Sequence, residues 1–228
     1  MNIVSSRALG LIVIGAVLYW SAVVLTMHVL EPEFSTIRAP MSAYVLGAYG
    51  PWMTTTYFAL CAALLGVGHG LVRTLPPTRL TRIAFSVFLI SASSVLLAGL
   101  FPMDFPGPPR TSSGRLHATG GLFAFPTMAL GAFLFSLSFR RDVYWRRVSV
   151  PSLALSTGII GVFILAVLSL FILGFAGYAQ RVLFALLCPW MIVVGLHLTR
   201  FSRASEESLR GPQPNKPLQP TSGSGTAE

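Results

Sequence analysis

The chain contains 228 residues, of which 54% are hydrophobic and only 10% are charged. Soluble domains carry about 25% charged residues, and the mean hydropathy of +0.72 is higher than such domains show. This composition excludes a secreted, disordered or nucleic-acid-binding chain. It indicates an all-α, polytopic protein of the membrane, with the lipid bilayer as its first partner.

Six apolar stretches of roughly 20 residues are each long enough to cross a hydrocarbon core of ~30 Å. They predict a bundle of six transmembrane helices. The first is longer than the apolar part of a signal peptide, so we expect it to remain as an anchor. The predicted helices are Ala8–Leu30, Pro51–Val72, Ile83–Phe101, Leu116–Ser138, Ser152–Leu173 and Tyr178–Thr199.

The net charge of +9 comes from cations that lie between the apolar stretches, so it does not indicate a nucleic-acid partner. Twelve Lys and Arg residues fall in segments on one side of the predicted bundle, and four fall on the other. Cytoplasmic segments carry the excess of cations. The sequence therefore predicts a multi-pass protein of the cell (inner or plasma) membrane with both termini in the cytoplasm.

The last part of the chain differs from the rest. From Ser202 onward it is rich in Pro, Gly and Ser and offers little apolar surface to offset the entropy of ordering. We expect two parts, a transmembrane domain over 1–201 and a disordered cytoplasmic tail over 202–228. Cys61 and Cys188 both fall inside apolar stretches, so they are interpreted as small core residues.

Polar residues gather in the segments predicted to face outward, at the ends of three helical hairpins. Asp104 and His117 flank one hairpin, so they are expected to approach each other, and Gln180 and Arg181 begin the last span. Such charges favour an outward-facing polar pocket for ligand binding, sensing or assembly, with a small molecule or lipid as the ligand. The predicted ligand-binding residues are Ser42, Tyr44, Asp104, Arg115, His117 and Arg181. An interfacial ion pair that closes the bundle is an equally good interpretation.

Short motifs at these positions resemble domain-of-unknown-function family 998. They are Ser42-Ala43-Tyr44 with Gly47 and Gly50, then Phe101-Pro102-Met103-Asp104, then His117. The resemblance covers about Ala8–Thr199 and leaves out the tail. It implies an integral membrane protein with about six spans, and it implies no activity, so whether the chain is an enzyme stays open.

Two alternative functions involve cofactors. His28, Asp104 and His117 are all predicted on the outer side and could supply three ligands to a metal such as zinc in a membrane-embedded hydrolase. The usual metalloprotease and serine-hydrolase motifs are missing from the sequence. The four histidines, two near each predicted end of the bundle, could also hold b-type haem for electron transfer. They are His28, His69, His117 and His197.

Secondary transport is disfavoured for a different reason. Ion and proton pathways are usually marked by ionisable residues inside the membrane, and no charged residue lies deep inside any of the six stretches.

Overall fold

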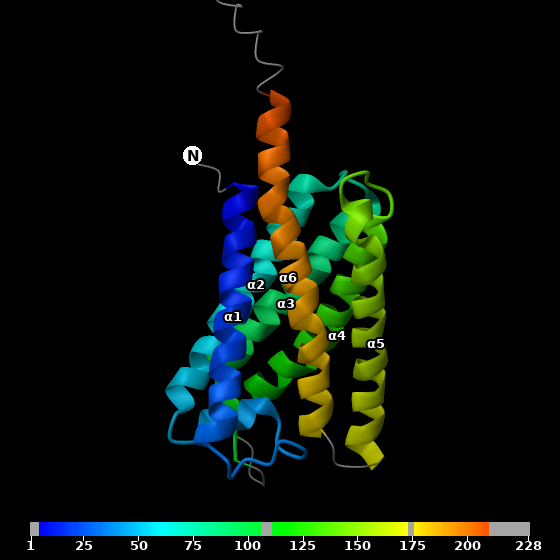
Figure 1. The fold of residues 1–228 in the computed structure, drawn as a ribbon. Helices are drawn as coiled ribbons and strands as arrows, with labels where there is room; N and C mark the ends of the chain where they lie inside the picture. Colours follow the sequence, from blue (N-terminus) through cyan, green and yellow to red (C-terminus); the bar gives the residue numbers. More distant parts are fainter. Residues whose placement is uncertain (1–4, 106–110, 173–175, 210–228) are drawn as a thin grey trace, which may run out of the picture.

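The computed structural model describes residues 5–105, 111–172 and 176–209, and within these the chain is helical throughout its regular structure (Figure 1). Six of its helices are long and apolar enough to cross a membrane. The predicted all-α fold with six spans is confirmed, and the chain is a multi-pass membrane protein. The elements are α1 (Ser6–Leu30), η1 (Met41–Leu46), α2 (Gly50–Thr74), α3 (Arg79–Leu100), α4 (Ser112–Phe139), η2 (Trp145–Val148), α5 (Ser149–Ile172) and α6 (Ala176–Leu209).

Most helices begin a few residues before the predicted apolar stretches, because polar residues make up the first turns. Helix α4 is the clearest case, since it begins at Ser112 and the predicted stretch begins at Leu116. The Thr111 side chain accepts a hydrogen bond from the Gly114 N–H and so satisfies a donor that the first turn would leave unpaired. Thr78 caps α3 in the same way.

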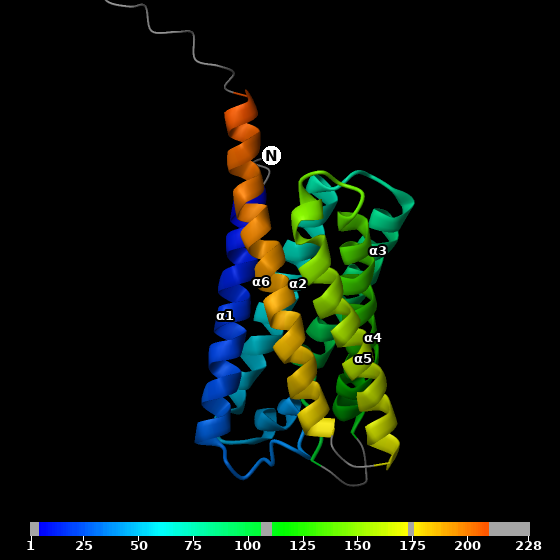
Figure 2. The same cartoon turned by 45° about the vertical axis from the view of Figure 1, so that its right-hand side comes forward.

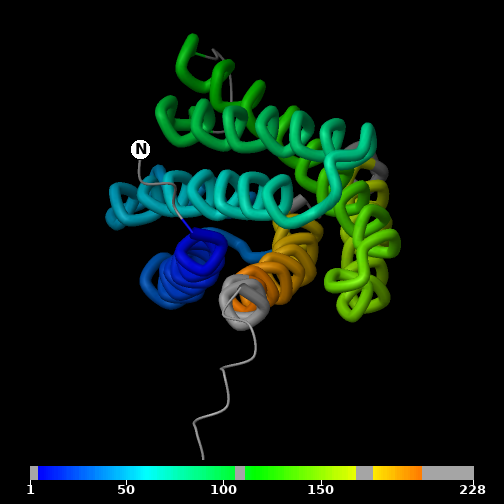
Figure 3. The backbone as a smooth tube through the Cα atoms, turned by 90° about the horizontal axis from the view of Figure 1, so that it is seen from above, coloured from blue at the N-terminus to red at the C-terminus, as the bar shows by residue number. Residues whose placement is uncertain are grey.

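The six helices form a closed ring. Each helix packs against the next one in the chain, and α6 returns to pack against α1, as the view along the bundle shows (Figure 3). Helix α6 runs obliquely, beside α1 near its own C-terminal end and towards α5 near its start (Figure 2). This oblique path brings the beginning of α6 across one end of the bundle.

Close approach of α1 and α6 depends on two glycines. A Cβ added at Gly10 would lie 2.5 Å from the Gly195 carbonyl oxygen, too close for any side chain. Small residues at such crossings let the backbones of membrane helices pack tightly.

The two ends of the bundle differ. Helix α1 begins and α6 ends at the same end, which we call the terminal end (Figure 1). The opposite end carries η1 together with the start of α6, and we call it the η1 end. The predicted tail starts at 202, whereas α6 extends to Leu209. Residues 210–228 lie outside the described residues, so the division into two parts remains a prediction.

Candidate ligand cavity at the η1 end

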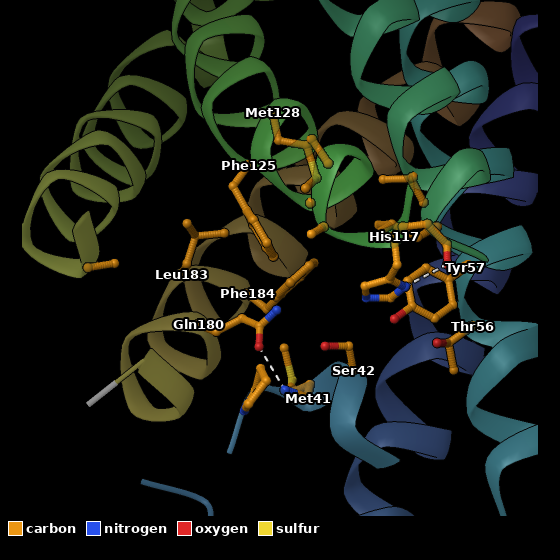
Figure 4. Close-up of a pocket in the computed structure, with 18 of the residues that line it drawn as sticks. Met41, Ser42, Thr56, Tyr57, His117, Phe125, Met128, Gln180, Leu183 and Phe184 are labelled. Atoms are coloured by element: carbon orange, nitrogen blue, oxygen red, sulfur yellow. Dashed lines mark hydrogen bonds between the residues drawn. The ribbon is translucent and has the colours of Figure 1, made fainter. Parts of the chain in front are cut away.

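A cavity of about 710 Å³ lies inside the bundle, towards its η1 end (Figure 4). Its walls are mostly apolar and come from α1, α2, α3, α4, α5, α6 and η1. The volume lies within the range of roughly 300–1,000 Å³ that small-molecule sites occupy. The larger apolar side chains on the wall are Trp20, Met53, Leu60, Phe125, Met128, Phe163, Leu183 and Phe184.

Five polar side chains interrupt this apolar wall. The Thr56 hydroxyl donates to the Met53 carbonyl of its own helix, and the other four side chains point into the same space (Figure 4). Ser42 comes from η1 and Tyr57 from α2. His117 comes from α4 and Gln180 from α6. A few polar groups that converge on an apolar cavity are typical of sites that fix the orientation of a small ligand.

The hydrogen bonds of His117 fix its tautomer. Its Nδ1 lies 2.9 Å from the Ala98 carbonyl oxygen and 3.0 Å from that of Phe101. Carbonyl oxygens only accept hydrogen bonds, so Nδ1 carries the hydrogen. In the neutral ring Nε2 is then an acceptor, and it is directed into the cavity beside Tyr57 (Figure 4).

Gln180 is oriented in a similar way by one hydrogen bond. Its Oε1 accepts from the Met41 N–H at 2.7 Å. The side-chain NH₂ group therefore points away from η1 and supplies two donors on the cavity side (Figure 4). The same bond connects Met41, the first residue of η1, to α6 at the end of the cavity.

Next to Gln180, Arg181 forms a second polar group, outside the cavity wall. Its Nε donates to His28 Nε2 at 2.8 Å, and its Nη2 donates to the Tyr44 hydroxyl at 3.0 Å. Its Nη1 donates to the carbonyl oxygens of Ala39 and Gly177, at 3.0 and 2.9 Å. We call Arg181, His28 and Tyr44 the Arg181 cluster; it joins α6, α1 and η1. Tyr44 is completely buried there.

Glu31, at the end of α1, is 1% exposed. Its Oε1 accepts from the Tyr49 N–H at 2.7 Å, and its Oε2 has no hydrogen-bond partner among the described residues. A Cβ at Gly47 would collide with this carboxyl group. The bond to Tyr49 ties the start of the α1–α2 connection to its end, and Gly47 leaves the space that the carboxyl group needs.

Asp104 contacts the start of α4. Its two carboxylate oxygens accept from the N–H and the hydroxyl of Thr111, at 2.9 and 2.6 Å. A negative charge beside the N-terminus of a helix is favourable. A Cβ at Gly114 would collide with the same carboxylate. Asp104 thus braces the connection between α3 and α4, together with the bond from the Ser113 hydroxyl to the Pro102 carbonyl.

The residues of the hydrolase alternative do not come together. No three His, Cys, Asp or Glu side chains gather into a metal site in the part of the chain that the structure describes. His28 uses Nε2 to accept from Arg181 and Nδ1 to donate to the Val24 carbonyl. Asp104 contacts Thr111, and His117 bonds two backbone carbonyls. The three side chains predicted as metal ligands therefore have separate partners.

The haem alternative also lacks a matching arrangement. Each of the four histidines has a ring nitrogen within hydrogen-bond distance of a backbone carbonyl. His69 is exposed and packs its ring edge-on against Phe85 of the neighbouring helix. His197 lies against Tyr144 and Trp145 at the terminal end. All four histidine rings thus pack on protein aromatics, each in a different part of the bundle.

A family model described as a protein of unknown function (DUF998) matches residues 13–197. The chain belongs to the DUF998 family. The match covers all six membrane-spanning segments at least in part, and it confirms the resemblance that the motifs around Ser42, Asp104 and His117 indicate. No curated protein and no solved structure matches the chain.

In this DUF998 protein the six predicted ligand-binding residues are distributed over several places. Ser42 and His117 line the cavity. Tyr44 and Arg181 contact each other in the Arg181 cluster. Asp104 bonds Thr111, and Arg115 is exposed and bonds Ser112. Their assignment to one ligand site remains a prediction, whereas each of these local contacts is a feature of the structure.

Besides Thr56, two polar cavity groups were not among the predicted ligand-binding residues. Tyr57 lies within the second apolar stretch. Its hydroxyl group among apolar residues is the only feature of the sequence that could indicate a role in a site. Gln180 begins the last span beside Arg181, but nothing in the sequence indicates that Gln180 faces a cavity while Arg181 bonds His28 outside it. Consecutive helical residues point about 100° apart, so they separate onto different surfaces.

Proposed function

We propose that this DUF998 protein is a membrane protein that binds a small apolar or amphipathic molecule in the cavity at the η1 end. The observation that carries the proposal is the convergence of Ser42, Tyr57, His117 and Gln180 on one mostly apolar space. The role is binding, in a sensor or an assembly factor. A metal-dependent hydrolase is less well supported, because its three candidate ligands have separate partners.

We also propose that the η1 end faces outward, in the cell membrane, and that the termini are cytoplasmic. Four Arg residues at the terminal end, Arg140, Arg141, Arg146 and Arg147, fall in a single short connection between α4 and α5. Short segments with such an excess of cations stay in the cytoplasm. The cavity would then be nearer to the outer face of the membrane.

Filling the cavity tests the binding function. A Cβ at Gly121, which lies on the cavity wall, would meet only Phe125 at 3.9 Å. Gly121→Val therefore adds bulk on the cavity wall, and its Cβ clashes with no neighbouring residue. Gly161→Val on α5 is the matched control, since a Cβ there meets nothing within 4 Å and Gly161 is not on the wall.

The measurement is native mass spectrometry of the full-length protein after incubation with an extract of bacterial membrane lipids. The wild type and Gly161→Val should retain the same small molecule, and Gly121→Val should lose it. Equal retention by all three proteins would show that the cavity is not the binding site.

A further inference from the structure

We infer that the ligand is an uncharged lipid whose head group carries a hydroxyl, held between Nε2 of His117 and the side-chain NH₂ of Gln180. This inference rests on the proposed binding function and names the chemical class that the cavity selects. It follows from the charge of the wall, from the two polar groups, and from the shape of the space.

The wall excludes a charged head group. Among the described residues that line the cavity there is no Asp, Glu, Lys or Arg. A carboxylate, phosphate or ammonium moved into such surroundings would lose its hydration without gaining a counterion, which is strongly unfavourable. Arg181, the nearest cation in sequence to the wall residue Gln180, already donates four hydrogen bonds to protein groups.

The polar groups match a hydroxyl. His117 presents an acceptor, because its Nδ1–H is held by the Ala98 and Phe101 carbonyls. Gln180 presents donors, because its Oε1 is held by the Met41 N–H. A hydroxyl can donate to Nε2 of His117 and accept from the NH₂ of Gln180 at the same time. An ester or ether can only accept, so it would leave Nε2 of His117 unpaired in an apolar cavity, which costs free energy.

The rest of the cavity matches an apolar chain or ring system. Beyond the polar groups, the wall continues through Phe125 and Met128 of α4 and Leu183 and Phe184 of α6. Trp20 of α1 stacks on Phe184, with ring centroids 4.4 Å apart, and both rings lie on the wall. The polar groups would therefore fix the head while the apolar wall buries the body of the lipid.

The position of Trp20 provides the assay. The full-length protein is placed in nanodiscs and titrated with dibrominated stearyl alcohol, with the corresponding stearate, and with its methyl ester. Bromine quenches tryptophan at short range, so a chain in the cavity should quench Trp20. Trp52 is 59% exposed, so all proteins carry Trp52→Phe to reduce quenching by probe dissolved in the bilayer. The signal that Gly121→Val retains is subtracted as background.

We expect the alcohol to bind about tenfold or more tightly than the ester and the carboxylate, since one hydrogen bond distinguishes the ester and charge burial distinguishes the carboxylate. His117→Asn keeps a donor for the Ala98 and Phe101 carbonyls but removes the acceptor Nε2. Gln180→Glu keeps the acceptor for Met41 but removes the donors. Each variant should weaken binding of the alcohol about tenfold. His117→Asn should leave the affinity for the ester unchanged.

The outcomes separate the two proposals. If the ester or the carboxylate binds as tightly as the alcohol once the Gly121→Val background is subtracted, the cavity binds a ligand but the assigned head group is wrong. If both His117→Asn and Gln180→Glu leave the affinity for the alcohol unchanged, the assigned head group is also wrong. If no probe quenches beyond the Gly121→Val background, both the inference and the binding function are overturned.

Discussion

The guanidinium of Arg181 donates through Nε to Nε2 of His28, 2.8 Å away, and so joins the start of α6 to the end of α1. The acceptors of its four hydrogen bonds are an imidazole, a phenol and two backbone carbonyls. Several donors in a fixed planar fork are needed to reach them all, which is a property of Arg and not of Lys. Arg181 therefore fastens η1 and two helices in one arrangement.

Removing the guanidinium group of Arg181 should destabilise the protein. Arg181→Gln should lower the free energy of unfolding by about 3 kcal/mol, because several partly buried hydrogen bonds from a charged group are lost at once. Arg115→Gln is the control, since Arg115 is exposed and bonds only Ser112, at 3.4 Å. Thermal unfolding in detergent measures both changes. Equal melting temperatures for the two variants would contradict the assigned role of Arg181.

Asp104 should stabilise the connection between α3 and α4 and should not bind the ligand. Asp104→Ala should lower the free energy of unfolding by about 1–2 kcal/mol through the loss of its two bonds to Thr111. In a double-mutant cycle with Thr111→Ala the two effects should add only in part, because both substitutions remove the bond between the Thr111 hydroxyl and Asp104. Retention of the cavity ligand should not change. Loss of the ligand with unchanged stability would instead place Asp104 in the site.

The crossing of α1 and α6 should tolerate no side chain at Gly10. Gly10→Ala forces a Cβ against Gly195 and Thr199 and should cost about 1–3 kcal/mol. Gly15→Ala on the same helix is the matched control, since a Cβ there meets nothing within 4 Å. It should be neutral or slightly stabilising, because Ala favours a helix more than Gly does. Melting temperatures that fall equally would argue against a close helix crossing.

Tyr144 should make the protein sensitive to alkali. Burial raises the pKa of Tyr144 above its usual 10.0, although Arg200 and Arg147 oppose the shift. A raised pKa in the folded state gives stability that is complete below pH 10 and is lost as the pH rises through the folded value. Its hydroxyl also donates to the His197 carbonyl at 2.8 Å. Tyr144→Phe should thus be about 1 kcal/mol less stable at pH 7.

The pH series supplies the test. From pH 10 upward the melting temperature of the wild type should fall more steeply than that of Tyr144→Phe. Parallel curves would mean that Tyr144 does not titrate differently in the folded and unfolded protein.

The orientation of the bundle can be tested without purification. Reporter fusions after Arg79 and Arg147, at the terminal end, should behave as cytoplasmic, and a fusion after Arg110, between α3 and α4, should behave as external. The opposite pattern would reverse the proposed topology and place the cavity towards the cytoplasm.

The amino-acid sequence was sufficient to predict the six spans, since a bilayer imposes a length and an apolar composition on each helix whatever its neighbours are. Short motifs also sufficed to indicate the family. The expected approach of Asp104 to His117 across the predicted hairpin stays a prediction, since Asp104 bonds Thr111 and His117 bonds the Ala98 and Phe101 carbonyls.

The composition of the site was decided only by the tertiary structure. A cavity exists where side chains from α1 to α6 and η1 fail to fill the space between them, and the wall residues are far apart in the sequence. Gln180 and Arg181 are neighbours, yet one bonds η1 from the cavity wall and the other bonds His28 outside it. Hydrogen bonds between segments far apart in the sequence decide which atoms of Gln180 and His117 remain free to bind a ligand. A local sequence pattern does not contain that information.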